Sequence, residues 1–137
     1  MSSKKSSGGT LRALLGRDGS HVPALSELEY LSVYDSCISS IDGVGLLESC
    51  PLTSLIVGCN PLKSLPSDLS FLTTLKELSC DDCLLVYDDL PPPVSNLTNL
   101  ETLRLSGNKV IVFFSLVFVS SEFAHTTDFF ASRFAGP

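Results

Sequence analysis

Apolar residues recur at fixed intervals through the middle of the chain. Four segments of eleven residues (the leucine-spaced segments) have apolar side chains at their first, fourth, sixth and eleventh positions, counting cysteine as apolar. The segments begin at residues 28, 52, 75 and 100, in steps of 24, 23 and 25. Around the fourth and sixth positions, apolar residues alternate with mostly polar ones, as in an extended strand with one buried face. The pattern therefore predicts four short strands, one in each segment.

The period of these segments indicates structural units that stack on their neighbours. A single unit has too few apolar positions to bury them alone, so adjacent units bury this surface for each other. We expect the side chains at the fourth and sixth positions, such as those of Leu55 and Val57, to stack from unit to unit on one face of the strands.

The four segments share the pattern L-x-x-L-x-L-x-x-N/C-x-L, with valine or isoleucine at some leucine positions, cysteine at one, and serine at the ninth position of the first. Over about residues 25–110 the chain resembles the leucine-rich repeat family, whose period is about 20–29 residues. Residues 65–72, Leu-Pro-Ser-Asp-Leu-Ser-Phe-Leu, resemble a segment of the intracellular repeats of Ras-interacting proteins and plant disease-resistance receptors. The resemblance implies an α/β repeat fold. We expect a short solenoid of about four repeats, with a concave parallel β-sheet and an irregular or short-helical convex side.

The ninth position of each segment marks the sharp turn that leaves the strand. Asn60 and Asn108 occupy it in the second and fourth segments, and an amide side chain can both donate to and accept from backbone groups inside such a turn. We expect the ninth-position residues to form a turn ladder, in which the cysteine is the weakest rung because a thiol is a weak donor. The ladder residues are Ser36, Asn60, Cys83 and Asn108.

The connections between the segments differ in their tendency to form helix. Residues 65–72 are compatible with a short helical turn, with Ser67 or Asp68 near its start. The run Pro91-Pro92-Pro93 predicts an extended connection instead, because proline lacks the backbone N–H that a helix interior requires. The predicted convex side is therefore short-helical in one connection and extended in another.

The N-terminal part of the chain differs in charge from the centre. Residues 1–17 carry four basic residues and no acid, whereas residues 21–110 carry twelve acids and four bases, a net charge of −8. We predict a flexible basic tail over residues 1–20 and a leucine-rich repeat domain over residues 21–110. The acidic balance argues against nucleic-acid binding, which requires clustered lysine and arginine.

Residues 111–137 have a third composition. Seven of the eight phenylalanines lie after residue 110, whereas 23 of the 24 leucines lie at or before Leu105, and the repeat period is lost. Three interpretations are open: a C-terminal cap on the array, a segment that contacts a membrane interface, and a truncated or foreign sequence, which the abrupt change favours. The apolar run over residues 110–119 is too short for a membrane-spanning helix, so we expect no stable membrane insertion.

The sequence contains no motif that predicts catalysis. It lacks a nucleophile elbow, a phosphate-binding glycine loop and an H-E-x-x-H motif, so we expect no enzyme activity and no cofactor. Cys80 and Cys83 form a C-x-x-C pair, which can be a redox site or half of a zinc site. No second pair is present and both cysteines fit the repeat, so we expect no metal site. An odd number of cysteines and no secretory signal favour a cytoplasmic location.

Strand side chains that point away from the core would form the concave face, the usual binding face of repeat arrays. Acids outnumber bases on this face, and two tyrosines and an isoleucine lie near its N-terminal end. Tyrosine is enriched at interface centres, and an acidic field attracts basic partners. We predict partner binding by Tyr30, Tyr34, Asp35, Ile56, Glu77, Asp81, Asp82 and Arg104.

These features favour a non-catalytic protein–protein interaction module that binds a basic segment of a partner protein. The family resemblance implies a role in intracellular signalling. One alternative is a specificity-domain fragment of a larger kinase or nucleotide-binding immune receptor. A membrane-associated protein held by its C-terminal segment is another, and an acidic face that only keeps the array soluble is the competing structural interpretation.

Overall fold

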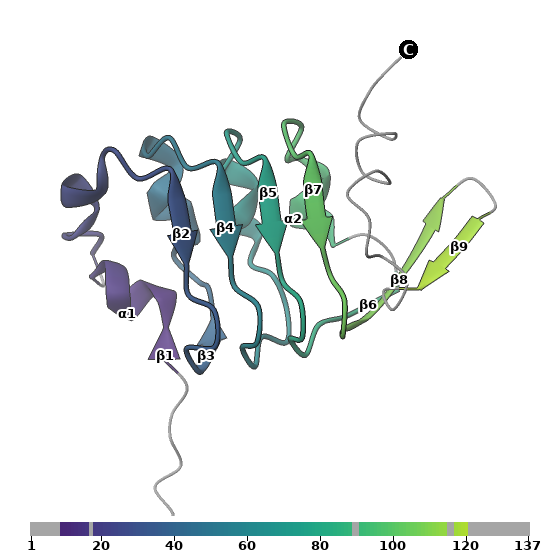
Figure 1. Ribbon diagram of the computed structural model, residues 1–137. Helices are drawn as coiled ribbons and strands as arrows, with labels where there is room; N and C mark the ends of the chain where they lie inside the picture. The colour runs from purple at the N-terminus through teal and green to yellow at the C-terminus, as the bar shows by residue number, and fades with distance from the viewer. Residues whose placement is uncertain (1–8, 17, 89–90, 115–116, 121–137) are drawn as a thin grey trace, which may run out of the picture.

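Four short strands form a parallel sheet at the centre of the molecule (Figure 1). The computed structural model describes residues 9–16, 18–88, 91–114 and 117–120. The strands are β2 (Tyr30–Ser32), β4 (Ser54–Ile56), β5 (Glu77–Ser79) and β7 (Thr102–Arg104), in this order across the sheet. The prediction of an α/β chain with parallel strands is confirmed. The fourth-position leucines lie in register from strand to strand: Leu31, Leu55, Leu78 and Leu103.

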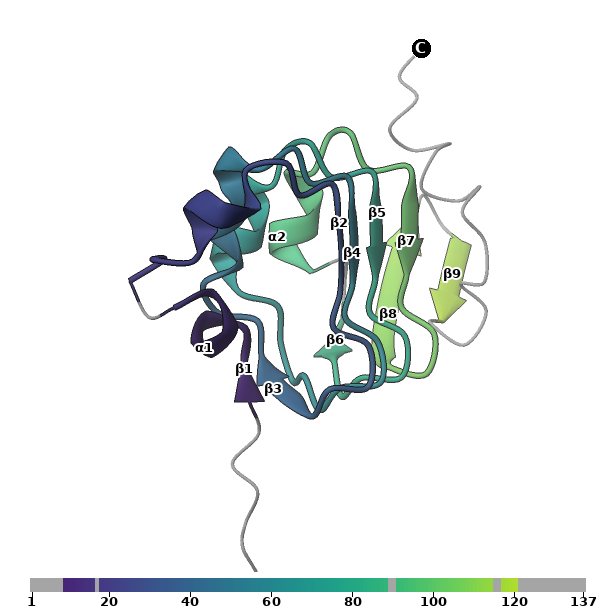
Figure 2. The ribbon, with the colours of Figure 1, turned by 60° about the vertical axis from the view of Figure 1, so that its left-hand side comes forward.

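The apolar core lies between this sheet and a layer of short helical segments on its other side (Figure 2). This layer contains the 3₁₀ helices η2 (Val44–Ser49) and η3 (Ser67–Phe71) and the α-helical turn α2 (Pro92–Ser95). Apolar side chains of the sheet and of all three segments belong to one buried cluster. The position of η3 confirms the short helical turn predicted within residues 65–72.

The helical turn α2 corrects the prediction of an extended connection at the three prolines. Pro91 precedes the turn, and Pro92 and Pro93 are its first two residues. The first backbone N–H groups of a helix have no partner within it, so proline is tolerated in the first turn. The turn ends after Ser95, whose hydroxyl donates to the carbonyl oxygen of Pro92 at 2.7 Å.

Short strands also follow the turns that end three of the leucine-spaced segments. β3 (Ile38–Ser40) pairs in parallel with β1 (Gly9–Thr10) at one end of the molecule. At the other end, β6 (Val86–Tyr87) pairs in parallel with β8 (Lys109–Phe114). The sequence pattern does not predict β1, β3 or β6, because two or three residues are too few to show a period.

The segment beside β2 corrects the prediction of a flexible tail over residues 1–20. After β1 comes the helix α1 (Leu11–Leu15), which is capped by Thr10: its Oγ1 accepts the N–H of Ala13 at 3.2 Å. Leu11 and Leu15, one helical turn apart, are both buried in the core cluster. The 3₁₀ helix η1 (Val22–Leu25) follows. Residues 9–16 therefore belong to the folded unit; residues 1–8 and 17 lie outside the described part of the chain.

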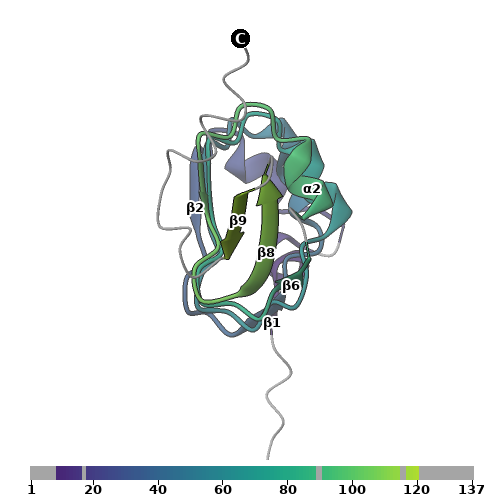
Figure 3. The ribbon, with the colours of Figure 1, turned by 90° about the vertical axis from the view of Figure 1, so that its right-hand side faces the viewer.

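Beyond β7 the chain forms a two-stranded hairpin (Figure 1). β8 pairs antiparallel with β9 (Val117–Ser120), with Ile111 opposite Ser120. Seen from this end, the hairpin stands in front of the space between the sheet and α2 (Figure 3). The rest of the predicted 111–137 segment, residues 115–116 and 121–137, lies outside the described residues, and its three interpretations stay predictions. No helix in the described part of the chain is long and apolar enough to cross a membrane.

Two leucines of α1 provide a matched test of this corrected boundary. Leu11 is 1% exposed and Leu14 is 58% exposed. We expect Leu11→Ala to lower the free energy of unfolding by about 2–5 kcal/mol, because it removes a buried side chain. Leu14→Ala should change it by less than about 0.5 kcal/mol. Urea unfolding followed by circular dichroism measures both, and equal effects of the two substitutions would show that α1 is not packed on the core.

Candidate functional site

The face of the sheet that points away from the core (the outer sheet face) contains the candidate site. Side chains alternate along each strand, so the residues on either side of the buried leucines point outward. Because the strands are parallel and in register, equivalent residues form rows across the sheet. One row contains Tyr30, Ser54, Glu77 and Thr102, and the next contains Ser32, Ile56, Ser79 and Arg104.

A depression of about 350 Å³ (the sheet hollow) lies on the outer sheet face. Its lining includes seven of the eight predicted partner-binding residues, and the eighth, Asp35, is exposed in the turn after β2. Ser79 also lines it and was not among the predicted site residues, although its outward position beside Leu78 could have indicated it. The lining residues are Tyr30, Tyr34, Ile56, Glu77, Ser79, Asp81, Asp82 and Arg104.

Tyr34 forms part of the aromatic wall of the hollow and is held by its neighbours. Its ring carbons lie 3.3 Å from the place where a side chain on Gly58 would begin, so the absence of that side chain lets the ring lie against the strand end. Its hydroxyl group and Cys59 Sγ are hydrogen bonded at 2.9 Å. The interaction with Cys59 is the largest of the effects that raise the pKa of Tyr34, and desolvation and the charges of Asp82 and Asp35 add to it.

The carboxylates around the hollow have different roles. Asp81 uses both oxygens: Oδ2 accepts from Arg104 Nε at 2.8 Å, and Oδ1 accepts the backbone N–H of Ser106 at 2.8 Å. Glu77 Oε2 accepts the hydroxyl of Ser54 at 2.8 Å, which fixes the glutamate side chain and leaves Oε1 as an acceptor. Asp81 therefore stabilises the turn beside β7 as well as contributing charge, a role that its outward position in the sequence did not reveal.

The residue before each turn-ladder position has a left-handed backbone conformation. The φ angles are 50° at Asp35, 54° at Cys59, 53° at Asp82 and 73° at Gly107. Aspartate and glycine adopt this conformation more easily than most residues. The conformation turns the chain out of each strand at the same place, and it brings Asp35 and Asp82 to the same edge of the outer sheet face.

The two asparagines of the predicted turn ladder are buried and hydrogen bonded to backbone. Asn60 Nδ2 donates to the carbonyl oxygens of Val33 and Val57 at 2.8 and 2.9 Å, and its Oδ1 accepts the N–H groups of Ser36 and Ile38, both at 3.0 Å. It therefore links its own turn to the preceding one. Asn108 does the same two levels further along, donating to the carbonyl oxygens of Cys80 and Leu105 and accepting the N–H of Leu85 at 3.1 Å.

The other two ladder residues make weaker or different contacts. The Cys83 thiol lies 3.5 Å from the carbonyl oxygen of Val57 and 3.7 Å from that of Asp81, and a thiol is a weak donor. Ser36 is exposed, and its hydroxyl donates to the carbonyl oxygen of Tyr34 within its own turn. The rung between the second and third segments is thus held by sulfur. Ser36 is not a rung, because only its backbone N–H takes part in the ladder, donating to Asn60 Oδ1.

The cysteines of the C-x-x-C pair occupy packing positions. Cys80 is buried in the core, and Cys83 is buried at the turn. Desolvation raises the pKa of Cys80 well above its ordinary value and also raises that of Cys83, so both thiols stay protonated at neutral pH. Among the described residues, no three histidine, cysteine, aspartate or glutamate side chains come together as metal ligands would.

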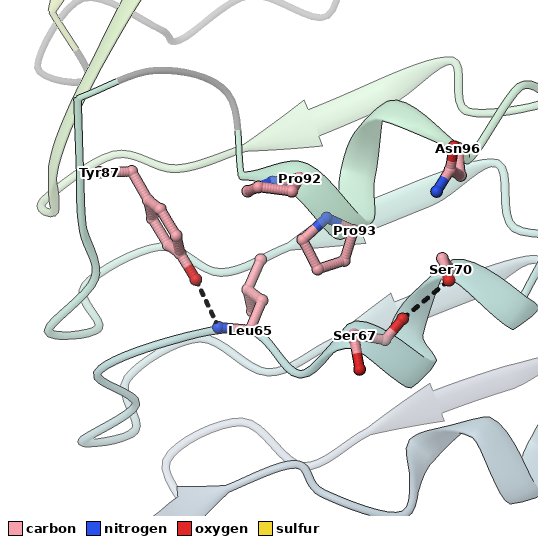
Figure 4. Close-up of a pocket in the computed structure, with 7 residues that line it drawn as sticks. All are labelled: Leu65, Ser67, Ser70, Tyr87, Pro92, Pro93 and Asn96. Carbon is pink, nitrogen blue, oxygen red and sulfur yellow. Dashed lines mark hydrogen bonds between the residues drawn. The ribbon is translucent and has the colours of Figure 1, made fainter.

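A second depression, of about 420 Å³, lies between η3 and α2 on the opposite side of the core (Figure 4). Tyr87 lies at one end, where its hydroxyl oxygen accepts the N–H of Leu65 at 2.7 Å. Prolines, serines and an asparagine form the rest of the lining, and no lining residue is charged at neutral pH. None of these residues was a predicted site residue, and the depression lacks the charged groups that mark the sheet hollow.

A search against protein-family models finds no match to this chain, and a comparison with curated proteins finds none either.

The unequal rungs of the turn ladder predict opposite effects of two substitutions. Asn60→Ala leaves buried backbone groups without partners and should lower the free energy of unfolding by about 1–3 kcal/mol. Cys83→Asn supplies amide donors to carbonyls that now face a thiol and should raise it by about 0.5–1.5 kcal/mol. Thermal and urea unfolding measure both. An unchanged unfolding midpoint for Asn60→Ala would contradict the ladder. A lower midpoint for Cys83→Asn would show that the thiol is not the weak link between these two turns.

The raised pKa of Cys80 predicts a loss of stability in alkali. An unfolded thiol loses its proton above about pH 8.5, whereas the buried thiol keeps it. The contribution of the protonated Cys80 thiol to the free energy of unfolding is therefore complete below that pH, and it declines as the pH rises toward the pKa of the folded state. Val57 occupies the position in the second leucine-spaced segment that Cys80 occupies in the third. We expect the variant Cys80→Val to lose less stability than the wild type between neutral pH and about pH 10. Tyr34 and Cys83, whose pKa values are also raised, are present in both proteins, so the difference between their urea-unfolding profiles reports on Cys80. Parallel profiles would contradict the assignment.

Proposed function

We propose that this chain is a leucine-rich repeat solenoid of about four repeats that acts as a non-catalytic protein-interaction module. The repeated motif, the steps of 24, 23 and 25 residues and the in-register parallel strands support the repeat assignment. The bonds of Asn60 and Asn108 support it independently, because each connects one turn to the next.

The module binds a basic segment of a partner protein on the outer sheet face. The observation that carries this proposal is the composition of the sheet hollow, where three carboxylates and two tyrosines gather with a single arginine. Tyr30 and Tyr34 are 59% and 56% exposed, although tyrosine has a large apolar surface that is usually covered at interfaces. An intracellular signalling role in the cytoplasm is part of the proposal and depends on the family resemblance.

The acidic edge of the outer sheet face provides a test that leaves the fold intact. Asp81 is a poor target because it supports the backbone of Ser106, whereas Asp35 and Asp82 are exposed. Asparagine tolerates the positive φ angles of both positions, so Asp35→Asn with Asp82→Asn removes two charges without backbone strain. We expect this variant to bind a short lysine- and arginine-rich peptide about 3–10-fold more weakly, mostly through a slower association rate.

The matched control is Asp42→Asn with Glu48→Gln, which removes the same charge from exposed residues outside the outer sheet face. Surface plasmon resonance at low and high salt measures both rates, and the difference between wild type and the first variant should shrink at high salt. If the two double variants bind the peptide equally well, net charge alone attracts it and the outer sheet face is not the site.

A further inference from the structure

The sheet hollow has two chemically different walls. On the β2 side, Tyr30 and Tyr34 present exposed aromatic rings, and Ile56 of the next strand is half-buried between the walls. On the β5 side stand the carboxylates of Glu77, Asp81 and Asp82. Small residues permit the depression, because Ser54 and Gly58 lie buried in the strand and turn between the two walls.

The charge of the hollow selects a cation. Three carboxylates and the guanidinium of Arg104 line it, for a net charge of −2. Arg104 is already paired with Asp81 at 2.8 Å, which leaves Glu77 and Asp82 as the carboxylates without a basic partner among the described residues. No cluster of metal-ligating side chains is present in the described part of the chain, so the arrangement favours an organic cation.

A serine hydroxyl in the hollow provides a second, independent indication of a ligand. Ser79 is only 6% exposed and lines the hollow, and its hydroxyl makes no hydrogen bond to any of the described residues. Its oxygen is not a fully buried atom without a partner, so it faces the open space of the hollow, where an occupant can reach it. A ligand that enters the hollow and donates a hydrogen bond would satisfy the Ser79 oxygen.

We infer that the sheet hollow is the binding site for a single arginine side chain of the partner segment. This inference rests on the proposed function and names the group that the hollow recognises. A guanidinium is planar, stacks on aromatic rings and carries five donors, whereas a lysine ammonium is a more strongly hydrated point charge. Its plane lies against the tyrosine wall, and its N–H groups donate to Glu77 Oε1, to Ser79 Oγ and to the Asp82 carboxylate.

The experiment uses the full chain and three short peptides that differ at one central residue. The flanks are glycine and serine, and the central residue is arginine, its uncharged isostere citrulline, or lysine. Amide chemical shifts of the ¹⁵N-labelled protein report both the affinity and the place of binding. We expect the arginine peptide to shift the amides of Ile56, Ser79 and Asp82, the lysine peptide to bind about 3-fold more weakly, and the citrulline peptide about 10-fold more weakly.

Two substitutions examine the two walls of the hollow. Tyr30→Leu keeps an apolar side chain but removes the aromatic face, and Glu77→Gln removes the charge but keeps an acceptor for Ser54. Each should weaken the arginine peptide about 3–10-fold. Phe71→Leu and Glu48→Gln are the matched controls at exposed residues outside the hollow and should leave the affinity unchanged. Thermal unfolding of every variant verifies that it is folded.

The outcomes separate this inference from the proposed function. Equal binding of the arginine and citrulline peptides overturns the inference, as does a set of shifted amides that excludes Ile56 and Ser79. Suppose instead that Tyr30→Leu and Glu77→Gln have no effect, while Asp35→Asn with Asp82→Asn still weakens binding of the lysine- and arginine-rich peptide. In that case the outer sheet face is the binding surface, but the hollow is not the binding site for an arginine side chain. Loss of binding in both sets of variants supports both.

Discussion

The hydrogen bonds of two buried asparagine amides are the constraint on which the structure depends. A chain that leaves a strand by a sharp turn buries backbone N–H and C=O groups that no strand or helix can pair. Asn60 pairs five backbone groups in two successive turns, and Asn108 repeats the arrangement further along. Because these bonds join consecutive turns, they help to hold the strands in register, and register decides which side chains meet on the outer sheet face.

The sheet hollow is a consequence of that register. Each row across the sheet combines one residue from every strand, so residues about two dozen positions apart in the chain become neighbours. Tyr30 shares its row with Glu77, and the row of Ile56 contains Ser79 and Arg104. The candidate site therefore consists of residues that are distant in the sequence and become neighbours only because they share a row. No local sequence motif marks such a site, so only the repeat period could predict which residues lie together.

Sequence analysis was most informative where a pattern repeats. The parallel strands and the outward residues around the hollow follow from alternation combined with a constant step, because four copies reinforce one another. The helix α1 was missed because Leu11 and Leu15 provide only one helical contact and sit in a basic segment. The turn α2 was missed because proline was judged as an interior residue rather than as the start of a helix. The bond from Ser106 to Asp81 was missed because alternation gives the direction of a side chain and not its partner.

The sulfur rung at Cys83 has a consequence for how the array responds to an occupant. The weakest link between turns lies between β4 and β5, and the sheet hollow extends over that same junction, from Tyr30 on one side to Glu77 and Arg104 on the other. A group held between the two walls would bind only the closed junction, and a ligand that binds one state stabilises it by mass action. Local separation of the two halves of the array and occupation of the hollow are thus thermodynamically linked. An occupant of the hollow would therefore add a link between the two turns whose own side-chain link, the thiol of Cys83, is the weakest of the ladder.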